Sequence, residues 1–300
     1  MRQQTKGIQF RLPVRSQMFR NEGPQGFLLR LAESNLLSPR ELKLGGISLD
    51  FETLHQHGLI PDKSLDPGLY DHIQEMCRLW TNEPRVWNMQ HARFCPHCLK
   101  VDGHWRVEWE LNFYDVCHHH GVWLIDQCTS CGEKLSWHRT EVMRCQCGSI
   151  LTAEFTTGAP ESIVKMANVM SSKIRHQQAP ETLVALKDTN IEQTQRLIRY
   201  LGNYMSQASG KNPLKMRNAG DLKQSWPVTS LAAEVLNDWP RAFHDSLNKI
   251  EKSQRSDGRP SFNQVFGHAY HYVFKALKEA PFNELRRQFE LCAYSNEMHH

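Results

Sequence analysis

Four short pairs of cysteine and histidine residues between positions 95 and 147 constrain this chain more than any other feature. Seven of its nine cysteines fall in that stretch. No signal peptide opens the chain, and no run of about eighteen apolar residues could span a membrane, so we expect a cytoplasmic protein. Thiols stay reduced in that compartment. Clustered cysteines there indicate metal ligands rather than disulfides.

The spacing of the pairs predicts two tetrahedral zinc sites, because each pair presents two ligands to one metal. The eight candidate ligands are Cys95, Cys98, Cys117, His120, Cys128, Cys131, Cys145 and Cys147. Sequential pairing assigns the first four to one ion and the last four to the other. A crossed arrangement, first pair with third and second with fourth, would also satisfy eight ligands. We favour the sequential one, because closing two short loops costs less entropy than closing longer interleaved ones.

Three consecutive histidines, His118 to His120, leave the ligand in the second pair open. We choose His120, because Cys-x-x-His repeats the spacing of the other pairs. The glycine that follows, Gly121, allows the backbone to turn away. His118 and His119 are then expected on a solvated loop or against a partner, and His97 is expected to be exposed.

The zinc is predicted to be structural. Sites with four protein ligands are closed, whereas catalytic sites keep a position open for water or substrate. The chain has no His-Glu-x-x-His, no His-x-Glu of a zinc deaminase, no phosphate-binding loop and no Gly-x-Ser-x-Gly. We therefore expect no enzyme. Zinc would supply folding energy to a small insert, and four tryptophans would pack between the ligand pairs: Trp105, Trp109, Trp123 and Trp137.

Outside the insert the sequence predicts a mainly α protein. We divide it into an N-terminal helix-turn-helix-like domain (1–90), a tandem zinc-ribbon region (91–152) and a C-terminal helical domain (153–300). Pro24 suits the first position of a helix, and the run from Ser38 to Glu41 forms a capping box. Asp50 and Asp66 precede further helices. The alternative to a helix-turn-helix is a plain three-helix bundle.

The C-terminal part shows apolar stripes at helical spacing, beginning near Pro160, Ile191, Ser230, Ser261 and Pro281. Between them, residues 207–227 read as a polar, basic loop. This loop contains the best candidates for nucleic-acid contact: Lys211, Lys215, Arg217 and Lys223. A solvated loop surface is the competing interpretation.

The charge balance argues against a dedicated DNA-binding protein. The net charge is only +4, and the candidate recognition helix "DFETLHQH", which opens at Asp50, contains no lysine or arginine. A helix in the major groove needs basic and amide side chains, whereas Asp50 and Glu52 repel phosphate. We expect this helix to pack against the protein or to contact another protein.

These motifs resemble the TniQ family of transposition target-selection proteins. The resemblance comprises Cys-Pro-x-Cys, Trp-Arg-x-x-Trp, Cys-x-x-His-Gly-x-x-Leu and a second cysteine pair, which here are Cys95–Cys98, Trp105–Trp109, Cys117–Leu124 and Cys128/Cys131. The segment "NEGPQGFLLRLAESN" resembles the family's opening acidic residue and amphipathic helix, although the usual Glu-Ser start is missing. The segment Asn237–Leu247 is similar to one in TniQ proteins of CRISPR-associated transposons.

The resemblance implies a noncatalytic adaptor in the bacterial cytoplasm. Such an adaptor links a CRISPR Cascade complex with its guide RNA to the AAA+ ATPase TnsC, which leads to DNA integration. It also implies a homodimer with weak or indirect contact to DNA and no membrane association. Two alternatives remain: a TnsD-like selector that reads DNA sequence itself, and a zinc-dependent helix-turn-helix transcription factor.

Overall fold

The computed structural model describes residues 11–152, 156–178, 183–206, 220–254 and 262–297. The chain is mainly helical, as the sequence predicts, and divides into two compact units. One comprises Met1–Glu110 with Ile125–Glu154, and the other comprises Leu111–Leu124 with Phe155–His300. These units follow contacts in space, whereas the division into 1–90, 91–152 and 153–300 follows the sequence and stays a prediction.

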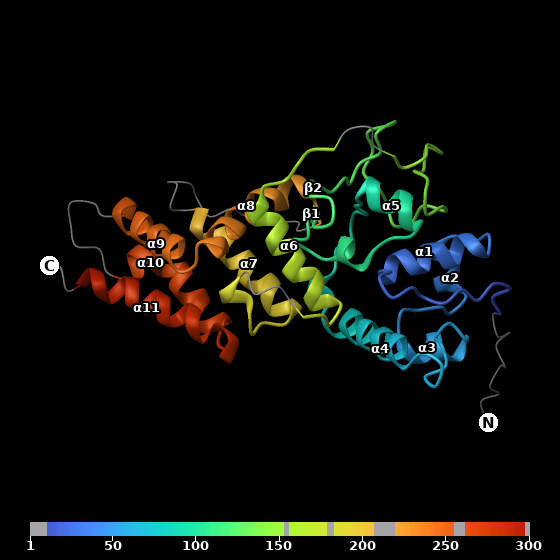
Figure 1. Cartoon of the computed structure of the whole chain (residues 1–300), viewed down its shortest axis with the longest axis horizontal. Helices are drawn as coiled ribbons and strands as arrows, with labels where there is room; N and C mark the ends of the chain where they lie inside the picture. The colour runs from blue at the N-terminus through green and yellow to red at the C-terminus, as the bar shows by residue number, and fades with distance from the viewer. Residues whose placement is uncertain (1–10, 153–155, 179–182, 207–219, 255–261, 298–300) are drawn as a thin grey trace, which may run out of the picture. The chain divides into compact units, whose positions relative to one another are not determined.

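Four helices form the N-terminal part of the first unit: α1 (Pro24–Ser34), α2 (Pro39–Leu44), α3 (Phe51–Gln56) and α4 (Pro67–Asn82) (Figure 1). They enclose one apolar core that includes the fully buried side chains of Phe27, Leu42 and Ile73. Short 3-10 turns follow at Pro84–Val86 and Val107–Glu110, with the short helix α5 (Pro96–Asp102) between them. The predicted helical bundle is confirmed.

Side-chain caps begin three of these helices where the sequence predicts them. Ser38 and Glu41 exchange the two hydrogen bonds of a capping box at α2. Asp50 accepts from the backbone N–H of Thr53 at α3, and Asp66 accepts from that of Leu69 at α4. Each cap satisfies a backbone donor that the helix leaves unpaired. The boundaries of this bundle therefore follow from local chemistry.

The second unit contains one two-stranded antiparallel hairpin and the remaining long helices. Strand β1 (Val116–Cys117) pairs with β2 (Val122–Trp123). The helices are α6 (Glu161–Ile174), α7 (Ile191–Met205), α8 (Leu222–Asn237), α9 (Arg241–Gln254), α10 (Phe262–His271) and α11 (Asn283–Glu297). Shorter turns lie at Val184–Leu186, Tyr272–Ala276 and Ala280–Phe282. Figure 1 shows α6 beside the hairpin, and α7 packs against α8.

The prediction of a loop up to residue 227, with a helix from Ser230, is wrong. Helix α8 already begins at Leu222, capped by the side chain of Asp221, and Pro227 lies inside it. A proline removes one helical hydrogen bond. Burial of Leu222, Val228 and other apolar residues on the same helix offsets that loss. Packing therefore overrides the local signal of the proline.

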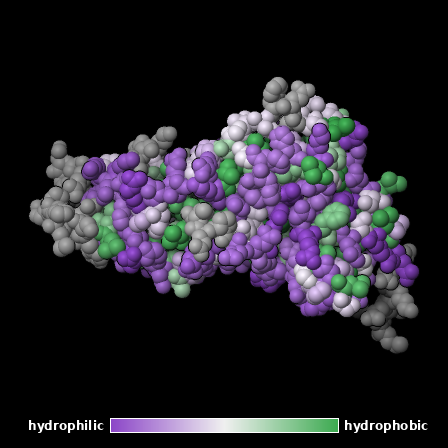
Figure 2. All heavy atoms as spheres, in the orientation of Figure 1, coloured by the Kyte–Doolittle hydropathy of each residue, from purple (hydrophilic) through white to green (hydrophobic). Residues whose placement is uncertain are grey.

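The face of the molecule in Figure 2 is mainly hydrophilic, with hydrophobic residues in small, separate groups (Figure 2). Single exposed hydrophobic side chains are normal on protein surfaces. No helix in the part of the chain that the structure describes is long and apolar enough to cross a membrane.

Candidate metal centres

The eight predicted ligands gather into two groups in the sequential order. Cluster 1 consists of Cys95, Cys98, Cys117 and His120, and cluster 2 of Cys128, Cys131, Cys145 and Cys147. Within each cluster the four ligand atoms lie within 4.8 Å of one another. The structure therefore favours sequential over crossed pairing. That these residues bind zinc stays a prediction, for which the geometry provides a first test.

The distances between ligand atoms fit a tetrahedral zinc ion. With Zn–S bonds of about 2.3 Å and Zn–N bonds of about 2.0–2.1 Å, two sulfurs lie about 3.8 Å apart, and a sulfur and a nitrogen about 3.5 Å apart. In cluster 2 the Sγ atoms of Cys128 and Cys147, and those of Cys131 and Cys145, are both 3.8 Å apart. In cluster 1 Cys117 Sγ lies 3.5 Å from His120 Nδ1. Both donor sets would hold zinc.

A glycine in the left-handed region follows three of the four ligand pairs. Gly121, Gly132 and Gly148 have φ values of +62°, +74° and +85°. The N–H groups of Gly121 and Gly132 bond to the carbonyl oxygens of Cys117 and Cys128, which closes the turn around each pair. Residues with a Cβ are strained at such φ values. The turn predicted at Gly121 is thus present, and it recurs in two of the other three pairs.

The neighbouring histidines have other roles. His118 is half-buried, and its Nδ1 lies 2.6 Å from the hydroxyl of Tyr114. The ring of His119 is exposed and lies 3.9 Å from that of His118. His118 is therefore engaged with Tyr114 rather than turned toward cluster 1, a role that its sequence position did not reveal. His97 is exposed, as expected.

Within cluster 2, Cys147 favours the thiolate form, whereas the pKa of Cys131, despite a backbone hydrogen bond from Glu133 that lowers it, is raised by burial and by hydrogen bonds with the neighbouring thiols. The side chain and the backbone N–H of Ser149 form hydrogen bonds that lower the pKa of Cys147 to about 6. The thiolate is the form that binds metal. With four thiol ligands the set is closed, so bound zinc would cross-link the chain and leave no position for substrate. This arrangement supports a structural ion.

Three of the four predicted tryptophans form one buried layer. Trp105 packs edge-on against Trp109 and Trp137, with ring centroids 5.6 and 5.4 Å away. The guanidinium of Arg139 lies 4.3 Å from the centroid of Trp105, a cation–π contact that accommodates a buried charge. The fourth tryptophan, Trp123, packs instead against Trp226 of α8, with the two rings tilted by 42°. Local sequence gives no sign of that partner.

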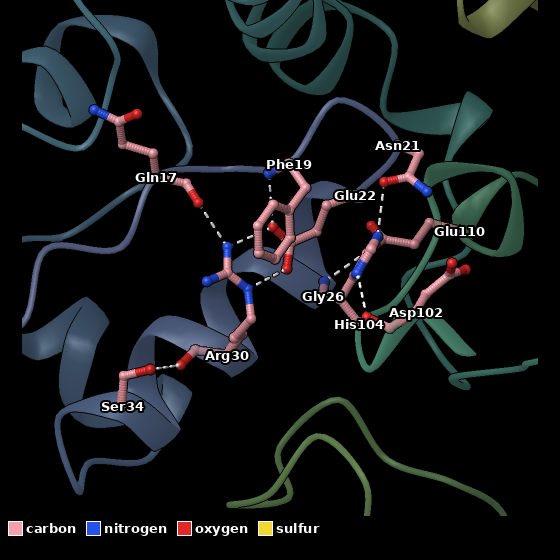
Figure 3. Close-up of polar contacts among 10 residues, drawn as sticks. All are labelled: Gln17, Phe19, Asn21, Glu22, Gly26, Arg30, Ser34, Asp102, His104 and Glu110. Atoms are coloured by element: carbon pink, nitrogen blue, oxygen red, sulfur yellow. Dashed lines mark hydrogen bonds and ion pairs between the residues drawn. The ribbon is translucent and has the colours of Figure 1, made fainter. Parts of the chain in front are cut away.

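A buried ion pair explains the acidic residue and the arginine of the N-terminal motif. Glu22 is completely buried, and Arg30 of α1 donates two hydrogen bonds of 2.6 Å to its carboxylate (Figure 3). The Arg30 guanidinium also reaches the carbonyl of Gln17 at 2.7 Å and lies 4.3 Å from the ring centroid of Phe19. A bidentate pair of this kind fixes the approach of the chain to α1.

A second buried carboxylate, Glu110, caps the same helix from far away in sequence. Its oxygens accept from the backbone N–H groups of Gln25 and Gly26 at 2.9 and 2.7 Å. The residue at the N-cap position, Gly23, has no side chain for this task. Figure 3 shows Glu110 approaching α1 at Gly26. A cap supplied from such a distance leaves no local signal in the sequence, so Glu110 cannot be recognised there as a functional residue.

Burial, together with the nearby charge of Glu22, raises the pKa of Glu110 to about 8, although the N–H donors of Gln25 and Gly26 lower it. The folded chain therefore keeps a proton that the unfolded chain loses near pH 4.5. We expect the contribution of Glu110 to the free energy of unfolding to fall as pH rises from about 4.5 to about 8, by up to about 1.4 kcal/mol per pH unit. Above about pH 8 its contribution should fall no further.

Urea unfolding at pH 6, 7 and 8 measures this effect when the wild type is compared with Glu110→Gln, which cannot titrate. The variant should be less stable at every pH, because an amide N–H₂ would face a backbone donor. Its free energy of unfolding should nevertheless fall less with pH. Parallel curves for the two proteins would contradict the assignment.

Of the four residues predicted to contact nucleic acid, only Lys223 lies within the described part of the chain. Lys211, Lys215 and Arg217 lie outside the described residues. Lys223 is exposed, but on the first turn of α8 rather than in a loop. Its role in nucleic-acid contact stays a prediction.

Comparison with known proteins identifies the N-terminal part of the chain. Residues 13–124 match the family model of TniQ. The match includes the Glu22–Arg30 pair, the tryptophan motif and cluster 1, and it ends before the first residue of cluster 2. No curated protein matches the chain. The resemblance read from the motifs is thereby confirmed over this segment.

Proposed function

We propose that this chain, which contains a TniQ domain and is therefore a transposon-associated target-selection protein, acts as a noncatalytic adaptor. It would connect a CRISPR Cascade complex and its guide RNA to the AAA+ ATPase TnsC, so that DNA is integrated at the selected target. The observation that carries the proposal is the TniQ match, which covers both the Glu22–Arg30 pair and cluster 1.

The site chemistry supports a role without catalysis. Both metal clusters offer four protein ligands, and such sets stabilise structure rather than activate water. The buried carboxylates of Glu22 and Glu110 are occupied by Arg30 and by the start of α1. These groups build the N-terminal fold, which an adaptor presents to its partners.

The acidic character of α3 favours an adaptor over a TnsD-like reader of DNA sequence. Its Glu52 is exposed, and the helix contains no basic side chain apart from histidine. Phosphate would be repelled from that face. The same observation disfavours a helix-turn-helix transcription factor.

We therefore expect weak binding to duplex DNA, without sequence preference, that weakens further as salt rises. Few phosphate contacts release few counterions, so the affinity is low at the start and falls less between two salt concentrations than that of a dedicated DNA-binding protein. Fluorescence anisotropy with labelled duplexes at 50 and 200 mM salt measures this, and Lys223→Ala should change the affinity little. Nanomolar binding to one particular duplex at physiological salt would contradict the proposal and support the TnsD-like alternative.

We also propose a homodimer, for which the helices between residues 23 and 57 and the segment 238–250 are the candidate contacts. Of two aromatic residues in the latter segment, Phe243 is fully buried, so it belongs to the core. Trp239 stacks on Phe243 at 5.0 Å and stays half-exposed. Trp239 is therefore the better candidate for an interface. Native mass spectrometry of wild type and Trp239→Ala tests this assignment.

The function is tested by deleting the gene in its host and measuring transposition. We expect deletion to abolish guided insertion and the intact gene to restore it. Tagged protein should recover Cascade subunits and the ATPase. Normal transposition without the gene, together with recovery of neither partner, would refute the proposed function.

A further inference from the structure

A hollow between α3 and α4 in the first unit is the feature that the metal centres and the motif contacts leave unused. It has a volume of about 470 Å³ and is lined by Phe51, Asp71, Gln74, Glu75, Cys77, Arg78 and Thr81. Apolar groups come from Phe51, which is half-buried, and Cys77, which is buried. The remaining lining residues are polar or charged.

The lining residues of α4 follow one face of the helix. Asp71, Glu75 and Arg78 are spaced four and three residues apart, and Thr81 extends the same row. At 1.5 Å per residue this row is about 15 Å long, or nearly three helical turns. A hollow of that length beside a helix has the dimensions to receive a short helix from another protein.

The charge around the hollow identifies what can enter it. Residues 48–83 contain seven acidic and two basic residues, a net charge of −5, although the whole chain carries +4. One of these acids, Asp66, is paired with Arg20 from outside the segment. The two basic residues already form ion pairs with the lining: Lys63 with Asp71 at 3.0 Å, and Arg78 with Glu75 at 2.6 Å. These pairs are solvent-exposed and therefore contribute little, so an incoming cation can replace or join them.

We propose that the α3–α4 hollow is a docking groove for an amphipathic helix of a partner protein that carries lysine or arginine beside an apolar anchor. The anchor would lie against Phe51, and the basic side chains would face Asp71 and Glu75. Nucleic acid is excluded by the same carboxylates, which repel phosphate. That the partner belongs to the transposition machinery rests on the proposed function. The charge and the apolar lining of the groove are independent of the proposed function.

Binding to two synthetic helices tests the groove. Both are fluorescein-labelled peptides of about four helical turns, with leucines at positions i, i+3, i+4 and i+7. At the remaining positions one peptide carries lysine and the other carries glutamate. We expect the lysine peptide to bind and the glutamate peptide not to. Asp71→Lys combined with Glu75→Lys should weaken binding about tenfold or more, equivalent to about 1.4 kcal/mol. Thr81→Arg should also weaken it by blocking the far end.

The matched control reverses two exposed acidic residues in the second unit, Glu234 and Glu290. This variant should bind the lysine peptide within about twofold of wild type, because neither of these side chains lines the hollow. All variants should unfold within a few degrees of the wild-type temperature, since the ion pairs that Asp71→Lys and Glu75→Lys break contribute little. Equal loss in both double variants, or equal binding of both peptides, would overturn the proposal.

Transposition in the host separates this proposal from the proposed function. If deletion abolishes insertion and the Asp71→Lys/Glu75→Lys variant fails to restore it, both stand. If deletion abolishes insertion but that variant restores it fully, the groove is not a partner site while the adaptor function stands. If deletion has no effect, the proposed function fails, and the peptide measurements alone decide the groove.

Discussion

Purified protein is expected to contain close to two zinc ions per chain, and removal of zinc is expected to unfold the region from Cys95 to Cys147. Apparent binding free energies of about 10–16 kcal/mol are typical of structural zinc in small peptides. Those values match or exceed the whole stability of an ordinary domain, about 5–15 kcal/mol. Metal analysis by mass spectrometry gives the stoichiometry, and circular dichroism during chelation follows the unfolding.

Single substitutions distinguish the two clusters. Cys131→Ser removes an exposed ligand of cluster 2 without opening a core cavity, so about one zinc per chain should remain and the protein should aggregate or lose local structure. Cys98→Ser should do the same for cluster 1. His120→Ala should lower the zinc content, whereas His118→Ala should not. Zinc content near zero in the wild type, an iron signal, or the reverse behaviour of the two histidines would contradict the assignment.

The second large effect is expected at Gly26, where a single methyl group should reverse the usual outcome of a glycine-to-alanine change. Alanine within a helix is normally more stable than glycine by about 0.5–1 kcal/mol. At Gly26, however, a Cβ would lie 2.5 Å from the Cβ of Trp105 and 3.1 Å from its carbonyl oxygen. Trp105 is completely buried, so its side chain has no space into which it could move away from the added methyl group. We expect Gly26→Ala to destabilise by about 1–3 kcal/mol, as overpacking does elsewhere.

The matched control is Gly267→Ala in α10, where a Cβ would meet nothing within 4 Å. It should be neutral or stabilising by up to about 1 kcal/mol. Urea unfolding of both variants measures the difference, and zinc content shows whether cluster 1 survives the change at Gly26. Equal stabilisation by both substitutions would show that the contact between α1 and Trp105 is looser than described.

The sequence predicts those parts of the molecule whose causes lie within a few residues. The caps at Ser38, Asp50 and Asp66 each bond to an N–H three residues ahead, so their signals are local. The ligand pairs are equally local, and their sequential grouping follows from the lower entropy of short loops. For this reason the helical bundle and both candidate clusters could be anticipated by residue number.

The remaining features depend on contacts between residues distant in sequence. Glu110 caps α1 from 84 residues away at Gly26, and only the folded chain brings the two together. The sequence predicts His118 on a loop surface or against a partner. Its contact with the hydroxyl of Tyr114 leaves no recognisable pattern in the sequence. Pro227 predicts a loop, whereas burial against the rest of its unit places it inside α8, which therefore begins earlier than its local sequence indicates.

The path of the polypeptide through its two compact units limits how the protein can be dissected. The chain changes unit after Glu110, after Leu124 and again after Glu154. No single proteolytic cut can therefore separate the two units, because even a cut after Glu154 leaves Leu111–Leu124 of the second unit on the same fragment as the first. A fragment that stops at residue 110 would lack the whole of cluster 2, together with Arg139, which lies over Trp105. Truncations of this protein should consequently behave as folding mutants, and loss of activity in one of them says nothing about which segment contacts a partner.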